Sequence, residues 1–362
     1  MDILQYEAFL VPTPYIQFSK NNLQGYYTIR TYVLAIAMGL IFDKTENEKQ
    51  NGLADQYDVS SQNTFAYVNY ANGKPQLFLY NEENAIDELV VEHDENTMIL
   101  DPSFSADGSI LAFVSTNKDK EEVLTSTVHF LDLRSKKISD VFTDESTITE
   151  VEFKPDDSSL LYLRAGTFEN YSPITGKRPH DFDVYEFDLA TNSHERKTDL
   201  SQYSIHSLQV SPDGKKVYLQ RDDDSTVETA EDSFMARQRI FEIPLEYPEE
   251  MKVISDPERE VDVFSFTITP TGNEIIFQSI SNPDSGGIFE YELFLYHFDS
   301  KKERQLTHLG KHASNPVVGA DGKTIYFMLD TNFGNGGPVN HLYKISFTGD
   351  HIEEIILPGR RQ

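Results

Sequence analysis

Five stretches of the chain repeat one arrangement: an apolar residue, a short polar turn, and then a run in which apolar and polar residues alternate. They are FSADGSILAF from Phe104, FKPDDSSLLY from Phe153, VSPDGKKVYL from Val210, ITPTGNEIIF from Ile268 and VGADGKTIYF from Val318. Alternation with a period of two is typical of a half-buried strand. An Asp-Gly turn between two strands predicts a two-residue β-hairpin in which glycine supplies the positive φ.

The turns recur at nearly regular intervals. Counted from Asp107 they follow at spacings of 49, 57, 58 and 50 residues, and a step of 46 residues back reaches SSQNTFAYVNY at Ser61, which keeps the strand but lacks the turn. A third apolar strand and a fourth strand after another polar turn complete each unit, as in ELFLYHF followed by KERQL. Six such units predict an all-β fold, a six-bladed β-propeller of four-stranded antiparallel blades, because radially arranged sheets bury one another's faces.

Composition and charge narrow the classes of partner. The chain has 362 residues, of which 38% are hydrophobic and 12% aromatic, and this composition is typical of a globular protein with a large core. The formal charge of −29 repels phosphate groups, so nucleic acid is excluded and anionic lipid disfavoured as a partner. The absence of cysteine excludes disulfides, thiolate metal sites and a cysteine nucleophile.

One strongly apolar run, YVLAIAMGLIF, extends from Tyr32 to Phe42. It is too short to span a bilayer alone but matches the core of a signal peptide in length. An export signal and a short membrane anchor are favoured over a buried element packed on the domain. Residues 1–57 are therefore expected to form a leader or anchor segment, and residues 58–357 the propeller. The expected location is secreted or membrane-anchored outside the cytoplasm of a bacterium, with the cytoplasm as the alternative.

The phrases PSFSADGSILAFVS, VSPDGKKVYL and KKERQLTHLG resemble the TolB-type repeat, a WD-like repeat whose family forms six-bladed propellers. Similar repeats occur in propellers of the dipeptidyl-peptidase group. The resemblance covers about residues 58 to 357, and the α/β domain that precedes the propeller in TolB proteins is expected to be missing. The resemblance implies a recognition scaffold, often in exported bacterial proteins, and it carries no catalytic residue onto this chain.

Long loops are predicted between the second and third strands of five units, all on one face of the disc. Insertions that collect on one face of a repeat array usually mark its binding face. The loop from Arg164 to Asp183 mixes aromatic and cationic residues, which are common in binding hot spots. The residues predicted to bind a protein, peptide or glycan partner are Phe168, Tyr171, Lys177, Arg178, His180, Asn332 and Phe333.

Catalytic and metal motifs are weak by comparison. The chain has no G-x-S-x-G elbow and no tryptophan, and its ten histidines are scattered. His129 and His297 lie in third strands and are predicted to be structural. The inner strands, whose side chains are expected to line the central channel, contain mostly apolar and hydroxyl residues, with Glu152 and Gln209 as exceptions. This composition favours binding without catalysis and without a cofactor.

Three alternatives stay open. One is a hydrolase or lyase with a site in the axial pocket, and another is a structural part of a larger envelope complex. The third is a Ca²⁺ site at RDDDS, HDFD or DTNFGNGG, stretches that begin at Arg221, His180 and Asp330 and lack the spacing of an EF-hand loop.

Overall fold

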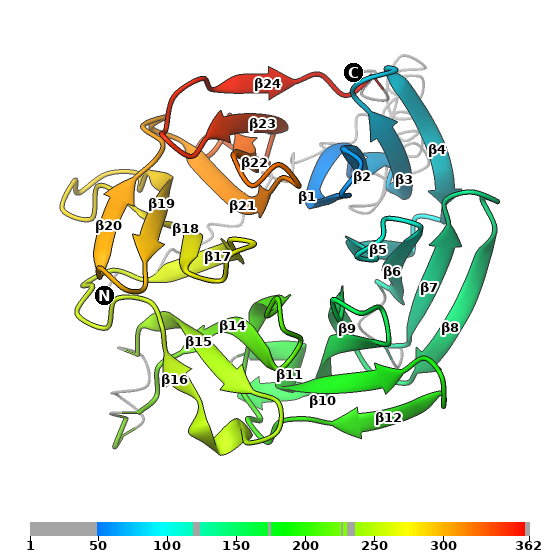
Figure 1. Ribbon diagram of the computed structural model, residues 1–362, viewed down its shortest axis with the longest axis horizontal. Helices are drawn as coiled ribbons and strands as arrows, with labels where there is room; N and C mark the ends of the chain where they lie inside the picture. The colour runs from blue at the N-terminus through cyan, green and yellow to red at the C-terminus, as the bar shows by residue number, and fades with distance from the viewer. Residues whose placement is uncertain (1–48, 119–123, 173–174, 226, 230–235, 359–362) are drawn as a thin grey trace, which may run out of the picture. The chain divides into compact units, whose positions relative to one another are not determined.

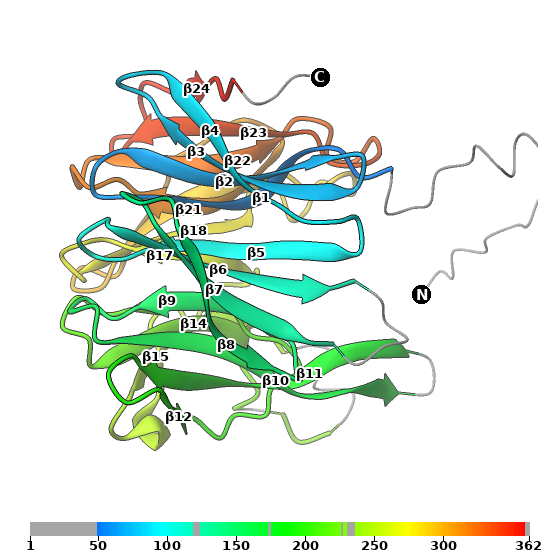
Figure 2. The same cartoon turned by 90° about the vertical axis from the view of Figure 1, so that its right-hand side faces the viewer.

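The computed structural model describes residues 49–118, 124–172, 175–225, 227–229 and 236–358. Residues Glu46–Gln362 form one compact unit, and Met1–Thr45, which contain the apolar run, are a separate unit outside the described residues. The described chain is all-β apart from a short 3-10 helix, η1 (Pro248–Glu250). Its sheets are arranged around a central axis (Figure 1), and their strands run between the two faces of the resulting disc (Figure 2).

The strands follow one another in groups of four. The first group is β1 (Gly52–Val59), β2 (Thr64–Ala71), β3 (Lys74–Asn81) and β4 (Ile86–Glu92), and the second is β5 (Thr97–Phe104), β6 (Ile110–Asn117), β7 (Ser126–Asp132) and β8 (Ile138–Asp144). The third is β9 (Ile148–Phe153), β10 (Ser159–Ser172), β11 (Thr175–Asp188) and β12 (Ser193–Arg196), and the fourth is β13 (His206–Val210), β14 (Lys216–Asp222), β15 (Gln238–Pro244) and β16 (Lys252–Val253). The fifth is β17 (Val263–Ile268), β18 (Glu274–Ile280), β19 (Tyr291–His297) and β20 (Lys302–Gln305), and the sixth is β21 (His312–Val318), β22 (Thr324–Asp330), β23 (Asn340–Ser346) and β24 (Glu353–Ile355).

The predicted four-stranded antiparallel sheets are confirmed. Groups one to four are separate sheets in which sequence neighbours pair. Groups five and six have the same internal order, but a single parallel bridge between Tyr291 and His312 joins them into one eight-stranded sheet. Each group comes from one continuous stretch of chain, so no sheet combines strands from both ends.

The repeated turns differ in detail from the prediction. Between β5 and β6 the chain turns over five residues, 105–109, and not over two. Gly108 has a φ of 68°, whereas Asp107 does not adopt a positive φ. Instead the Asp107 carboxylate accepts hydrogen bonds from the Ser109 amide and the Ser105 hydroxyl, both at 2.8 Å. The repeated aspartate therefore has a structural role, holding a longer turn whose glycine takes the left-handed position.

Hydrophobic side chains fill the seams between consecutive sheets. Phe65 from β2 packs in one such cluster with Tyr326 and Met328 from β22, so the first group packs directly on the sixth. The rings of Phe65 and Tyr326 meet edge to face at 5.0 Å between centroids. The Tyr57 hydroxyl donates to the carbonyl of Asn315 at 2.7 Å across the same seam. The ring is thus closed by side-chain packing and hydrogen bonds.

The start of the β domain differs from the expected boundary. β1 begins at Gly52, so residue 58 lies inside the first strand and not before it. The alternating pattern of this strand is weak because several of its residues, Gln56 and Asp58 among them, are polar. Among the described residues, no helix is long and apolar enough to cross a membrane.

Candidate functional site

The third group carries the longest hairpin of the described chain. β10 and β11 each have 14 residues, and their pairing continues from Ser159↔Asp188 to Ser172↔Thr175. Figure 2 shows the pair reaching past β5 and β6 on the face where second and third strands are joined, here called the long-loop face. The predicted loop from Arg164 to Asp183 is therefore a two-stranded ribbon. Sequence reasoning missed it because TFENYS mixes strand-forming residues with polar ones and has no regular alternation.

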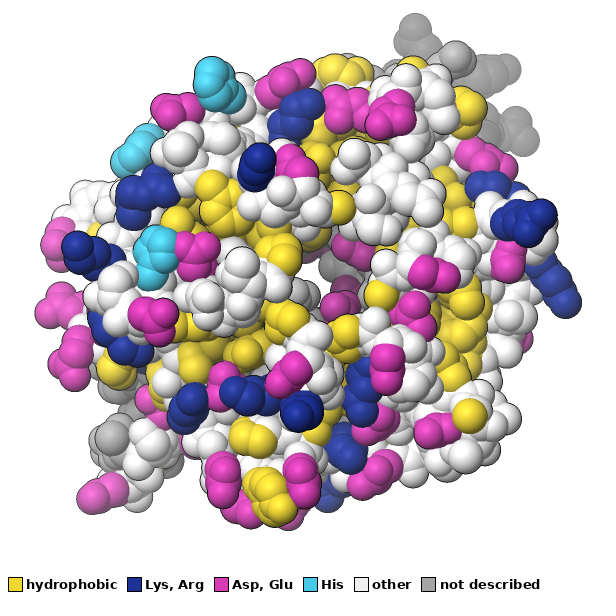
Figure 3. Space-filling view, in the orientation of Figure 1, with side chains coloured by type: hydrophobic (Ala, Val, Ile, Leu, Met, Phe, Trp, Pro, Cys, Tyr) yellow, Lys and Arg dark blue, Asp and Glu magenta, His cyan; other side chains and the backbone are white. Residues whose placement is uncertain are grey.

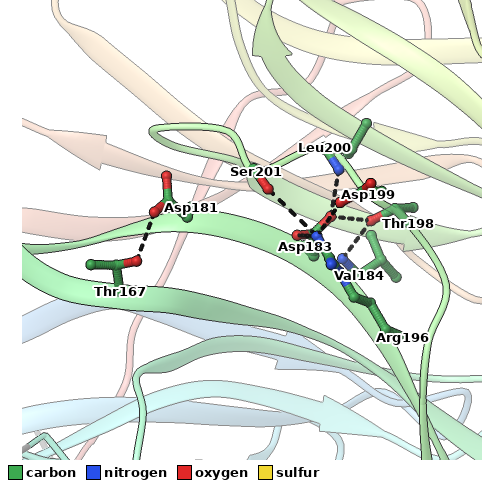
Figure 4. Close-up of polar contacts among 9 residues, drawn as sticks. All are labelled: Thr167, Asp181, Asp183, Val184, Arg196, Thr198, Asp199, Leu200 and Ser201. Atoms are coloured by element: carbon green, nitrogen blue, oxygen red, sulfur yellow. Dashed lines mark hydrogen bonds and ion pairs between the residues drawn. The ribbon is translucent and has the colours of Figure 1, made fainter.

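Small side chains and hydrogen bonds fix the base of this hairpin. A Cβ on Gly166 would lie 3.0 Å from the carbonyl oxygen of Asp181, so glycine allows the two strands to approach. The Thr167 hydroxyl donates to the Asp181 carboxylate at 2.7 Å, and this bond contributes most to lowering the pKa of Asp181. Buried Asp183 accepts from the side chains of Arg196 and Thr198 and from the amide of Leu200 (Figure 4), at 2.6, 2.8 and 2.6 Å. The acidic HDFD stretch therefore anchors the hairpin to the segment that follows β12.

The hairpin brings some of the predicted binding residues together. The Lys177 ammonium lies 4.6 Å from the centroid of the Phe168 ring, and the two side chains share one face of the ribbon. Arg178 is exposed and stands opposite Glu169 on the paired strand. His180 is only 8% exposed, and its Nδ1 lies 3.1 Å from the Asp181 carboxylate, so it belongs to the hairpin base and not to the surface. Tyr171 lies in β10, but its side chain is outside the described part of the chain.

Asn332 and Phe333 lie in a different place. Both belong to the connection between β22 and β23, which Figure 1 shows across the axis from β10 and β11. The Phe333 ring stacks on His312 at 4.7 Å and meets Tyr291 edge to face at 5.4 Å. The Asn332 side chain donates to the carbonyl of Gly337 at 2.8 Å and closes its own loop. The predicted binding residues thus form two separate groups, and the second pins a loop.

The axial channel is more acidic than predicted. A cavity of about 280 Å³ on the axis is lined by inner-strand residues that include Asp58, Asp101, Glu150 and Glu152. Figure 3 shows acidic side chains inside the central opening. Apolar and hydroxyl residues make up most of the lining, as expected, but Asp101 and Glu150 were not predicted, because the inner strands contain bulges, as between Leu100 and Ser103. A bulge turns an additional residue toward the axis, here Asp101 with a φ of 44°.

Comparison with known proteins identifies the fold. No family model matches the chain, and no curated protein matches it. TolB from Acinetobacter baumannii is similar with a TM-score of 0.55 and 15% identity, over 88% of this chain and 66% of that one. A putative TolB from Agrobacterium tumefaciens gives 0.57 and 14%, over 77% and 87%. The chain has a TolB-type β-propeller fold. An oligogalacturonate lyase from Vibrio parahaemolyticus gives 0.52 and 12%, over 80% and 76%, so enzymes share this fold.

The channel carboxylates of this TolB-type propeller link neighbouring sheets. Asp58 accepts from the amide of Phe104 at 2.8 Å, and Asp101 accepts from the amide of Val151 at 2.6 Å. Glu150 accepts from two amides of the fourth group, those of Ser207 at 2.9 Å and Leu208 at 2.6 Å. Each of these acids therefore joins its own sheet to the next one, and this explains acidic residues on the axis without a ligand.

Burial changes the protonation of these groups. It raises the pKa of Asp58 to about 6 and that of Glu152 to about 8, and the negative charge of Asp58 adds to the effect on Glu152. Burial and the charge of Glu150 raise the pKa of Asp101 well above its usual range. Carboxyl groups crowded in a partly enclosed space resist ionisation, so Glu152 retains its proton at neutral pH. Raised values of this kind also occur in catalytic acids, so the channel is the place where an enzyme site would lie.

The histidines of the third strands are structural, as predicted. His129 contacts the Ser115 hydroxyl through Nε2 at 2.7 Å and the Asp140 carboxylate through Nδ1 at 2.8 Å. These contacts have the order of a Ser-His-Asp triad, but the Asp140 side chain is 73% exposed, whereas a triad carboxylate is buried. His297 pairs with Glu274 on the adjacent strand. These histidines thus link neighbouring strands within a sheet.

The stretches predicted as Ca²⁺ ligands are occupied by protein donors. The Asp183 carboxylate accepts hydrogen bonds from Arg196, Thr198 and Leu200. Asp330 accepts from the amides of Asn332 and Val339 at 2.9 and 2.8 Å. In the fourth group, Arg221 pairs with Asp224. Within the described ranges, no group of three or more His, Asp or Glu side chains is placed to hold a metal ion. The Ca²⁺ site therefore stays an open alternative from the sequence.

Proposed function

We propose that the chain is a six-bladed, non-catalytic recognition propeller that binds a protein partner on its long-loop face, with the β10–β11 hairpin as the main contact. The observation that carries the proposal is the projecting ribbon itself. It presents Phe168, Lys177 and exposed Arg178 on a base fixed by buried hydrogen bonds. A rigid base reduces the entropy lost on binding, and aromatic and arginine side chains are enriched in binding hot spots.

The blade count and the location belong to this proposal. Six blades follow if the eight-stranded sheet is taken as two groups of four, because both groups have the internal order of the other sheets. An extracytoplasmic location is supported by the apolar run from Tyr32 to Phe42, which matches a signal-peptide core in length.

Replacing residues 168–179 with a short Gly-Ser linker is expected to abolish binding while the fold survives. None of the described side chains among them belongs to the hydrophobic clusters between the sheets, and the anchoring residues Asp181 and Asp183 remain. Binding would be measured as recovery of the partner from extracts of the native host on the tagged chain, and folding as the midpoint of thermal unfolding. The matched control is the same replacement of residues 282–289 in the β18–β19 connection. Undiminished recovery by the hairpin replacement would contradict the proposal.

An enzyme working in the axial channel is the second candidate. It is favoured by the raised pKa of Glu152, since a carboxyl group protonated near neutral pH can act as a general acid. Binding is preferred because Asp58, Asp101 and Glu150 are already engaged by backbone amides of the neighbouring sheets. These groups would have to leave structural partners in order to contact a substrate.

A further inference from the structure

The edge of β10 that pairs with β9 faces the axis, and the described residues leave it unpaired over half of its length. β9 pairs with β10 as far as Ile148↔Arg164, and one more hydrogen bond joins the Ala165 amide to the carbonyl of Thr147 at 2.9 Å. Beyond Ala165, the described residues supply no strand on this side of β10. Backbone groups of a strand point alternately to its two sides, so those of Thr167 and Glu169 point to the same side as Ala165. An unpaired edge of this kind is a template for another extended chain.

A cavity lies where β9 leaves this edge. It has a volume of about 140 Å³ and is lined by Leu124, Glu145, Ser146, Thr147, Ala165, Gly166, Thr167, Phe168 and Lys177. Thr147 is only 5% exposed, and its hydroxyl has no hydrogen-bond partner within the described part of the chain. Buried hydroxyl groups in folded proteins nearly always have a partner, so a water molecule or a ligand group in the adjoining cavity would complete the hydrogen bonding of Thr147.

We propose that an extended segment of a partner protein adds to this edge as a strand and places one side chain in the cavity. The segment continues the ladder that β9 leaves, bonding to the backbone of Thr167 and Glu169. Its inserted side chain contacts the apolar wall formed by Leu124, Ala165 and Phe168 and makes a hydrogen bond with the Thr147 hydroxyl. The inference rests on the proposed function, because it specifies how the hairpin holds a protein partner.

Charge determines the kind of side chain that fits. The cavity rim carries one cation, Lys177, and one anion, Glu145. A cationic side chain is repelled by Lys177, and an acidic segment is repelled by Glu145 and by the net charge of −29 on the whole chain. The residue whose side chain enters the cavity is therefore uncharged and combines an apolar part with a hydrogen-bonding group, as threonine, asparagine and glutamine do.

The test uses a pair of substitutions at one exposed position of the edge. Glu169→Pro removes an amide that points away from β11, so the hairpin ladder keeps its own hydrogen bonds. Glu169→Ala removes the same side chain but keeps the amide. Phage-displayed random dodecapeptides would be selected on the wild-type protein, and the selected sequences made as synthetic peptides for calorimetry. We expect Glu169→Pro to weaken binding by about tenfold or more and Glu169→Ala by less than about twofold.

A third variant tests the cavity. Thr147→Val keeps the shape of the side chain and removes only the hydroxyl, which has no partner in the free protein. The thermal midpoint is therefore expected to stay the same or rise, whereas the affinity for the selected peptides falls by about fivefold. A fall in stability without a change in affinity would show that the hydroxyl serves the fold and would overturn its assignment to a ligand.

Other results would overturn strand addition as a whole. They are equal affinities for the two Glu169 variants, a selection that yields no peptide, and peptides that still bind after residues 168–179 are replaced. Conversion of a dimer to a monomer by Glu169→Pro would show that a second copy of this chain occupies the edge. If the hairpin replacement loses the host partner while Glu169→Pro keeps it, strand addition fails and the proposed function stands.

Discussion

Replacing Glu152 with glutamine is expected to stabilise the protein at pH 9 and to leave its stability nearly unchanged at pH 5. Burial and the charge of Asp58 raise the pKa of Glu152 from 4.5 to about 8 in the folded state. Between these two values the folded protein holds a proton that the unfolded chain has lost, so stability falls as the pH rises and is lowest above pH 8. Glutamine cannot ionise, and its side-chain oxygen can still accept from the Ser103 hydroxyl, which lies 3.1 Å from Glu152.

The expected gain at pH 9 is about 2–4 kcal/mol, because one pKa unit corresponds to about 1.4 kcal/mol and partial exposure reduces the full effect. Thermal or urea unfolding at pH 5, 7 and 9 measures it. The matched control is Glu150→Gln in the same strand, because Glu150 accepts from the amides of Ser207 and Leu208 and an amide oxygen can replace only one carboxylate oxygen. This control is expected to destabilise the protein at pH 5 by about 1–3 kcal/mol through the lost amide hydrogen bond, and the loss becomes smaller toward pH 9 because burial also raises the pKa of Glu150. A Glu152→Gln variant that is less stable at pH 9 would contradict the assigned protonation.

Replacing Phe65 with alanine is expected to open the seam between the first and sixth groups. Phe65 is fully buried and meets Tyr326 edge to face, and this seam holds the two ends of the ring together by packing. Removing a buried phenylalanine side chain costs about 3–5 kcal/mol. Because each sheet is one continuous segment, we expect faster hydrogen exchange in β2, β3, β22 and β23 than elsewhere.

The control for this seam is Phe187→Ala. Phe187 is also buried, but it packs between the second and third groups, which are consecutive in the chain. We expect Phe187→Ala to lose a similar amount of stability, with faster hydrogen exchange only in the second and third groups. Equal exchange in β2 and β22 for both variants would show that the seam between the chain ends is not a separate weak point.

The fold could be predicted from sequence because the same turn recurs with a strand on either side. Apolar runs such as ILAF and KVYL, and the spacing near 50 residues, reflect forces that act within each unit. The length of the turn could not be predicted, because Asp-Gly suits a two-residue hairpin as well as the five-residue turn at Asp107. That difference depends on the hydrogen bonds of Ser105 and Ser109.

The polar residues of the axial channel could have been found from the sequence, because each of the five repeats has a polar residue at the same position. Three positions before the apolar residue of each repeat, the chain has a polar residue: Asp101, Glu150, Ser207, Ser265 and Asn315. All five line the axial cavity. The bulges that turn them inward depend on contacts with neighbouring sheets and could not be derived from the pattern of one unit.

The positions of the candidate binding residues in the fold could be predicted in part. Grouping Phe168 with Lys177 and Arg178 was sound because they lie in one segment, but the segment's strand pairing depends on the whole hairpin. His180 looked like a surface residue beside charged neighbours, yet it is buried at the hairpin base beside Asp181, whose φ of 58° interrupts the regular strand. Asn332 and Phe333 lie elsewhere because they belong to the sixth group, where the Phe333 ring packs on His312 of β21 and on Tyr291 of β19.

Site-specific photocrosslinking in the native host tests the central claim most directly. A benzophenone amino acid would replace Arg178 at the exposed side of the hairpin and, in a separate control, Lys215 in an exposed turn on the opposite face. The account predicts one discrete protein adduct from position 178 and none from position 215. Adducts of the same protein from both positions, or from position 215 alone, would contradict recognition by the hairpin on the long-loop face.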